Sequence, residues 1–187
     1  MPVSEVVDAL HGKDPIPKQR VLAWMRESSL ETRGAIYVLT DREWSRIQPE
    51  LSMEEQCTFM GSYLVECLAG DPPETDWVHG GFEAGHLLAA WFKHLHSTSG
   101  TQKVLAGAAT QLTAAYRKSD KKSRNRIETG ALEHIFEQPA LRLYFAEWCD
   151  DPDLREAYKW AVRWGDDHLV GSGRSIEEIA QGSGGDT

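Results

Sequence analysis

The sequence predicts an all-α protein, a single domain of about eight helices packed as antiparallel hairpins. Three observations support this fold class. Apolar residues recur at helical spacing along most of the chain, helix-capping patterns alternate with Gly and Pro breaks, and no two strand-like segments occur that would pair. The length of 187 residues fits one domain.

The first predicted elements are short helices. Amphipathic spacing predicts helices over Val3–Leu10 and Lys18–Glu27. The segment Gly34–Leu39 is short and partly β-branched, so its composition also fits one strand. We expect a helix there, because an isolated strand would leave its backbone groups unpaired.

Longer helices follow. Capping-box patterns at Thr40–Glu43 and Ser52–Glu55 predict two helix starts, and the second helix ends near Gly70. Capping residues and Gly or Pro breaks then delimit the remaining predicted helices, which are Gly80–Ser97, Lys103–Arg117, Ser119–Glu137, Pro139–Cys149 and Asp151–His168. Residues 171–187 are rich in Gly and Ser and predict a flexible tail after a helical domain over residues 1–170.

A faint internal similarity indicates an alternative architecture. The segment Gly61–Leu68 resembles Gly130–Phe136, and each segment ends shortly before a Pro. Stacked helical hairpins, as in helical-repeat proteins, produce such a similarity. A short solenoid-like arrangement is therefore the alternative to a simple bundle.

Composition narrows the class of function. The net charge of −9 disfavours general nucleic-acid binding, because that function needs a positive surface. The start of the sequence lacks the features of a signal peptide, and no segment approaches the length of a membrane span. Three Cys without a Cys-x-x-Cys pattern are typical of free thiols in a reducing compartment. We therefore expect a cytoplasmic protein with no cofactor and no membrane or nucleic-acid partner.

One predicted helix carries a pattern that resembles a metal site. Glu83 and His86 have the Glu-x-x-His spacing of di-iron carboxylate bundles, and His94 lies on the same polar side. A di-iron site needs two such pairs and two further glutamates, whereas this sequence has one pair. An exposed polar helix face explains the pattern better. The alternative function is a helical-bundle enzyme or metal-binding protein centred on Glu83, His86 and His94.

A basic run between Arg117 and Arg126 is the segment that would grip phosphate or RNA. It lacks interleaved aromatic residues, and it lies at a predicted junction between helices in an otherwise acidic chain. We interpret it as a solvated connection, with nucleic-acid binding as a weaker alternative.

An acidic and aromatic cluster surrounds the junction between the last two predicted helices. Trp160 lies there at the edge of the apolar stripe of its helix, and an edge Trp beside Arg is typical of a binding hot spot. An acidic face suits a basic partner. The competing explanation is that the acids only cap a helix and the aromatics are buried. The predicted partner-binding residues are Tyr144, Glu147, Trp148, Asp150, Asp151, Asp153, Glu156 and Trp160.

The stretch SDKKSRNRIETGALEHI, from Ser119 to Ile135, resembles a segment of small all-helical bacterial proteins of unassigned function. Some proteins of that type resemble immunity proteins, which protect a cell from its own toxin. The resemblance implies an interaction protein and carries over no binding residues. Since no catalytic motif occurs either, we expect a non-enzymatic protein-binding module, such as an immunity protein or antitoxin that neutralises a basic toxin.

Overall fold

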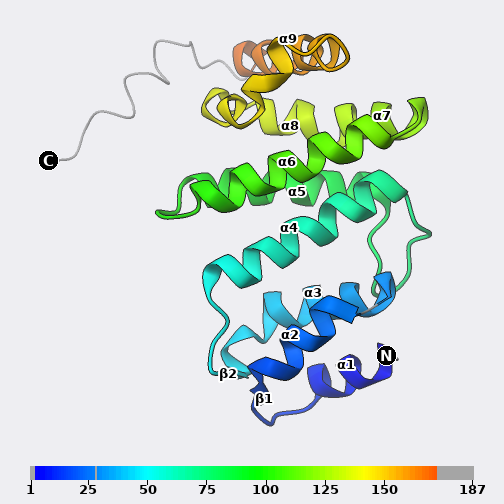
Figure 1. Ribbon diagram of the computed structural model, residues 1–187, viewed down its shortest axis with the longest axis vertical. Helices are drawn as coiled ribbons and strands as arrows, with labels where there is room; N and C mark the ends of the chain where they lie inside the picture. The colour runs from blue at the N-terminus through cyan, green and yellow to red at the C-terminus, as the bar shows by residue number, and fades with distance from the viewer. Residues whose placement is uncertain (1–2, 28, 172–187) are drawn as a thin grey trace, which may run out of the picture.

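The computed structural model describes residues 3–27 and 29–171, which are helical almost throughout. Figure 1 shows the helices stacked in successive layers along the long axis, from the N-terminal helices at one end to α9 (Arg155–Gly171) at the other. The predicted all-α fold is confirmed. From residue 172 onward, the predicted tail lies outside the described residues.

The N-terminal layer consists of three helices and a short bridge of parallel strands. Ile16 pairs with Ile47, and Pro17 pairs with Gln48. Sequence reasoning missed this bridge, because two-residue strands leave no alternating pattern. The elements of this layer are α1 (Val3–His11), β1 (Ile16–Pro17), α2 (Lys18–Glu27), α3 (Leu30–Arg42), the 3₁₀ turn η1 (Trp44–Arg46) and β2 (Ile47–Gln48).

Helix α3 corrects one predicted boundary. The helix start predicted at Thr40 is wrong, because α3 runs through this residue and ends at the C-terminal cap Glu43. The helix begins earlier, where the Ser29 hydroxyl oxygen accepts a hydrogen bond from the Thr32 N–H at 3.3 Å. The helix expected over Gly34–Leu39 is confirmed as part of α3.

Three long helices form the middle of the stack. They are α4 (Met53–Gly70), α5 (Gly81–His96) and α6 (Gln102–Lys118). The predicted capping box at the start of α4 is confirmed. Ser52 Oγ accepts from the Glu55 N–H at 3.2 Å, and Glu55 Oε2 accepts from the Ser52 N–H at 2.7 Å.

The C-terminal layers contain a helix of mixed geometry and a 3₁₀ segment. In the π-helical turn the Glu133 N–H donates to the Glu128 carbonyl, five residues earlier. The additional residue in this turn changes which side chains face the neighbouring helices, and π turns are frequent at functional sites. The elements before α9 are α7 (Lys121–Ile127), the π turn η2 (Glu128–Leu132), α8 (Glu133–Phe136) and the 3₁₀ segment η3 (Pro139–Cys149).

Two hydrophobic cores meet on α4. The N-terminal core contains Ile36 of α3, and α4 contributes Phe59 to it. The C-terminal core contains Phe92 and Trp148, and α4 contributes Leu64 to that core. Helix α4 therefore joins the N-terminal layer to the rest of the stack.

Candidate functional site

The predicted partner-binding residues lie on η3, on the turn that follows it and on the first half of α9, at one end of the stack (Figure 1). Tyr144 and Asp151 are half-buried there. The exposed members of the set are Glu147, Asp150, Asp153, Glu156 and Trp160.

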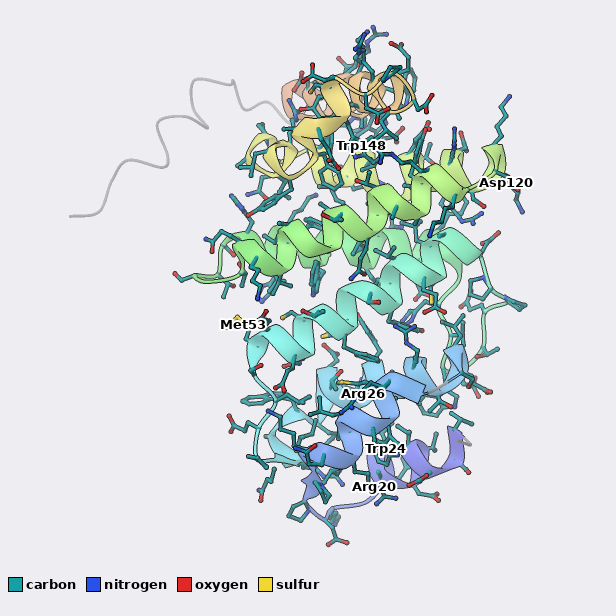
Figure 2. The ribbon with its side chains drawn as sticks, viewed as in Figure 1. Arg20, Trp24, Arg26, Met53, Asp120 and Trp148 are labelled. Atoms are coloured by element: carbon teal, nitrogen blue, oxygen red, sulfur yellow. The ribbon has the colours of Figure 1, made fainter. Side chains whose placement is uncertain are left out.

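Trp148 is a correction to this set. Its side chain is fully buried, and its Nε1 donates a 2.8 Å hydrogen bond to Thr113 Oγ1 on α6. Its ring packs against Tyr116, with centroids 5.0 Å apart. Figure 2 labels Trp148 near the C-terminal end of the stack. Trp148 therefore attaches η3 to α6, and the fold leaves it no surface for a partner.

Asp151 stabilises the junction between η3 and α9. Its Oδ1 accepts from the Asp153 N–H at 2.8 Å, and its Oδ2 accepts from Arg117 Nη2 at 2.6 Å. The backbone hydrogen bond from Asp153, and then the Arg117 guanidinium, hold the pKa of Asp151 below its usual range. Arg155 Nε, at the start of α9, donates to the Cys149 carbonyl at the end of η3 at 2.9 Å. This hydrogen bond also holds the two elements together.

The other carboxylates of the junction are less well compensated. The side chains of Glu147, Asp150 and Asp153 have no ion pair among the residues that the structure describes. Glu156 pairs with Lys159 at 2.9 Å, but both side chains are largely exposed to solvent, so this pair contributes little. The surface beside the start of α9 therefore keeps negative charge.

Trp160 is the exposed aromatic residue of this surface. It is 50% exposed, and its Nε1 donates a 2.8 Å hydrogen bond to Glu133 Oε1. Glu133 lies on α8 and is only 6% exposed. The indole is thus held by a buried acceptor while its apolar surface stays open to solvent. A side chain with its orientation already fixed loses little entropy on binding.

A row of aromatic rings continues beside Trp160, and the sequence interpretation missed it. His134 of α8 contacts His86 of α5 and Trp164 of α9, with ring centroids 4.8 and 5.0 Å apart. Trp164 in turn stacks on His168 at 3.5 Å. The spacing of Trp160, Trp164 and His168 by four residues is the sequence signal of a shared helix face. Glu156 lies four residues before Trp160 on the same helix, and Asp153 lies in the turn just before α9. Together the residues Asp153, Glu156, Trp160, Trp164 and His168 form what we term the α9 face.

The residues of the alternative metal site are not assembled. His86 contacts His134 on α8, and both Glu83 and His94 are exposed on α5. Within the described ranges, no group of three or more His, Cys, Asp or Glu side chains is placed to hold a metal ion.

The interpretation of the basic run between Arg117 and Arg126 as a solvated connection is wrong for Arg126, which is buried, whereas Lys121 and Lys122 are exposed. Arg126 is 2% exposed and donates to the carbonyls of Leu68 and Ala69, at 2.7 and 2.8 Å, where α4 ends. It also contacts Asp71 at 3.2 Å. Arg126 therefore satisfies carbonyl groups that the end of a helix leaves without a partner.

Comparisons with protein-family models, with curated proteins and with solved structures find no match for this chain. In the described part of the chain, no helix combines the length and the hydropathy of a bilayer-spanning segment.

Proposed function

We propose that the chain is a non-enzymatic protein-binding module that recognises a basic surface of its partner through the α9 face. The observation that carries this proposal is the half-exposed Trp160 ring, fixed by the buried Glu133 and lying on a helix that follows a turn with the unpaired carboxylates Asp150 and Asp153. Rigid aromatic anchors of this kind dominate the energetics of many protein interfaces.

Charge complementarity determines the kind of partner. The chain has a net charge of −9, and Asp150 and Asp153 add local negative charge that no described cation neutralises. Such a surface attracts a basic protein over long range and speeds encounter. Within this class we propose an immunity protein or antitoxin, because toxins that cleave nucleic acids need a basic surface to bind their substrate.

The first experiment identifies the partner with matched variants. The full chain is immobilised and used to capture proteins from an extract of the cells that produce it. The Trp160→Ala and Trp44→Ala variants are immobilised and tested in the same way. Trp44 is 47% exposed on η1, so it controls for the loss of a half-exposed Trp elsewhere. Basic proteins retained by the wild type and by Trp44→Ala, but lost with Trp160→Ala, are then purified.

The second experiment measures kinetics with the purified partner. Trp160→Ala should speed dissociation by about thirtyfold, the effect of losing one hot-spot residue. The charge reversal Asp150→Lys/Asp153→Lys should slow association by about tenfold at low salt. Glu74→Lys/Asp76→Lys makes the same charge change on the exposed loop between α4 and α5 and should have a smaller effect. If the reversal Asp150→Lys/Asp153→Lys leaves association rate and affinity unchanged, the proposed interface is wrong.

A further inference from the structure

The ring of Trp160 is open to a further contact. The residue is 50% exposed, and among the described residues no aromatic ring or cation is paired with its ring. Elsewhere in this chain, arginine guanidinium groups lie over Trp24, Phe59 and Tyr116, at 4.9, 5.6 and 5.1 Å from the ring centroids. These are cation–π contacts, for which Trp is the best of the aromatic side chains. The Trp160 ring therefore has the surface for such a contact and lacks the cation.

The carboxylate of Glu133 increases the attraction of this ring for a cation. It accepts the hydrogen bond from Trp160 Nε1 at 2.8 Å, and it has no ion pair among the described residues. A negative acceptor polarises the indole and raises the electron density of the ring. Glu133 is also only 6% exposed, so solvent and salt screen its charge less than that of a surface carboxylate. A cation on the ring would be attracted both by the ring and by the charge bonded to it.

The cations of α9 itself do not occupy this position. Lys159 and Arg163 line a hollow together with Tyr158, and Trp160 is not part of its wall. Lys159 in addition pairs with Glu156 at 2.9 Å. A cation for the Trp160 ring therefore has to come from another molecule.

We propose that the Trp160 ring stacks on the guanidinium group of an arginine side chain of the partner. This inference rests on the proposed function, which makes the partner a basic protein, and it names the chemical group that is recognised. A planar and weakly hydrated guanidinium stacks on a single aromatic face, whereas the ammonium group of lysine is compact and strongly hydrated. A methylated ammonium is bound in a cage of several aromatic rings, but at Trp160 one ring is open. Glu133 is then the residue that favours a charged group over a neutral one.

The amides of N-acetyl-arginine and N-acetyl-citrulline form a matched pair of probes. Citrulline has a planar, neutral urea group where arginine has its guanidinium, so the two probes are nearly equal in shape and differ in charge. Binding to the full chain is followed in ¹H–¹⁵N spectra, where the Trp160 indole signal is identified by its loss in Trp160→Phe. We expect the arginine probe to shift this signal and to bind at Trp160 about fivefold more tightly than the citrulline probe.

Trp44 provides a control within the same spectra. It is 47% exposed, and no described carboxylate is bonded to its indole N–H. We expect a preference of about twofold or less for the arginine probe at Trp44. This value measures the general attraction of a cation to an open ring on a chain with a net charge of −9.

Two substitutions test the role of Glu133. Glu133→Gln keeps an amide oxygen that accepts from Trp160 Nε1 but removes the charge, so the preference at Trp160 should fall to the value at Trp44. Glu147→Gln removes a charge from an exposed side chain of η3 and should leave the preference unchanged. Equal binding of the two probes at Trp160 in the wild type would overturn the proposal, and so would an undiminished preference in Glu133→Gln.

The probes separate this proposal from the proposed function. A captured protein that requires Trp160, together with equal binding of the two probes, would support the protein-binding function and overturn arginine as the recognised group. A clear preference for the arginine probe without a captured protein would support the cation site and overturn the proposed protein partner.

Discussion

Trp160 on α9 and Glu133 on α8 are joined by a 2.8 Å hydrogen bond between the indole Nε1 and the carboxylate Oε1. The bond connects a residue that is 50% exposed to one that is 6% exposed. Glu133 therefore fixes the orientation of the Trp160 ring, and the indole N–H in turn provides a hydrogen bond to a buried carboxylate oxygen. The surface anchor and the packing of α8 against α9 are consequently coupled.

The first prediction concerns this pair. Trp160→Phe keeps an aromatic ring but removes the donor, which leaves the Glu133 carboxylate buried with one hydrogen bond fewer. We expect the free energy of unfolding to fall by about 1–3 kcal/mol, measured by urea denaturation. Trp44→Phe, at the 47% exposed Trp of η1, should change it by less than about 0.5 kcal/mol.

Removing both partners provides the control for that prediction. The double variant Trp160→Phe/Glu133→Met replaces donor and acceptor by apolar groups and should recover much of the lost stability. If the double variant is as unstable as the sum of its single variants, the hydrogen bond does not couple the two residues.

Arg126 provides the second prediction. Arg126→Met removes the donors to the Leu68 and Ala69 carbonyls and leaves the end of α4 without its partner. We expect a loss of about 3 kcal/mol in the free energy of unfolding, typical of breaking a buried charged network. Lys121→Met, at an exposed cation of the same run, should have almost no effect. Equal effects of the two substitutions would contradict a structural role for Arg126.

Local patterns in the sequence predicted most helices. Where two capping patterns look alike, however, packing determines which of them begins a helix. The capping boxes at Ser52 and Thr40 look alike, yet only Ser52 begins a helix. Thr40 is fully buried inside α3, a helix whose N-terminal cap Ser29 lies eleven residues upstream. A capping pattern can act only where the chain is not already helical, and one stretch of sequence does not contain that information.

The candidate site was predicted in part, and helix geometry explains what was missed. Trp160 lies at the edge of an α-helix, where 3.6-residue spacing holds. Trp148 lies on a 3₁₀ segment, in which successive side chains are rotated differently, so its burial did not follow from α-helical spacing. His134 follows a π turn, and its contact with Trp164 was likewise not visible in a regular pattern.

The third prediction concerns two glycines within helices. The sequence alone does not show which of them has room for a Cβ. Gly107→Ala should raise the free energy of unfolding by about 0.5–1 kcal/mol, because a Cβ meets no neighbour there. Gly85→Ala should lower it by about 1–3 kcal/mol, because its Cβ would lie 2.6 Å from the Gly130 carbonyl oxygen and the backbone would have to move. Thermal unfolding of both variants measures the difference, and the same sign for both would contradict a close approach of α5 at Gly85 to the Gly130 backbone of η2.

The last prediction concerns pH and the capping box of α4. Hydrogen bonds from Lys18 and then from the Ser52 N–H lower the pKa of Glu55 to about 2. In the unfolded chain the pKa of Glu is about 4.3, so the folded state binds this proton less readily. The stabilisation by Glu55 is therefore complete above about pH 4.3 and is lost as the pH falls toward about 2.

Glu55→Gln keeps an acceptor for the Ser52 N–H but loses the charge that pairs with Lys18 at 2.7 Å. At pH 7 we expect it to be less stable than the wild type by about 0.5–1 kcal/mol, because the pair is only partly shielded from solvent. The difference in stability should shrink through the window from about pH 4.3 to 2, because the protonated glutamic acid then resembles glutamine.

Urea unfolding at a series of pH values measures this difference in stability, with Glu54→Gln as the control. Glu54 pairs with Lys103 on the open surface, with side chains 59% and 84% exposed, so its substitution should have little effect at any pH in the window. A stability difference between Glu55→Gln and the wild type that stays constant down to pH 2 would show that the Glu55 charge does not stabilise the start of α4.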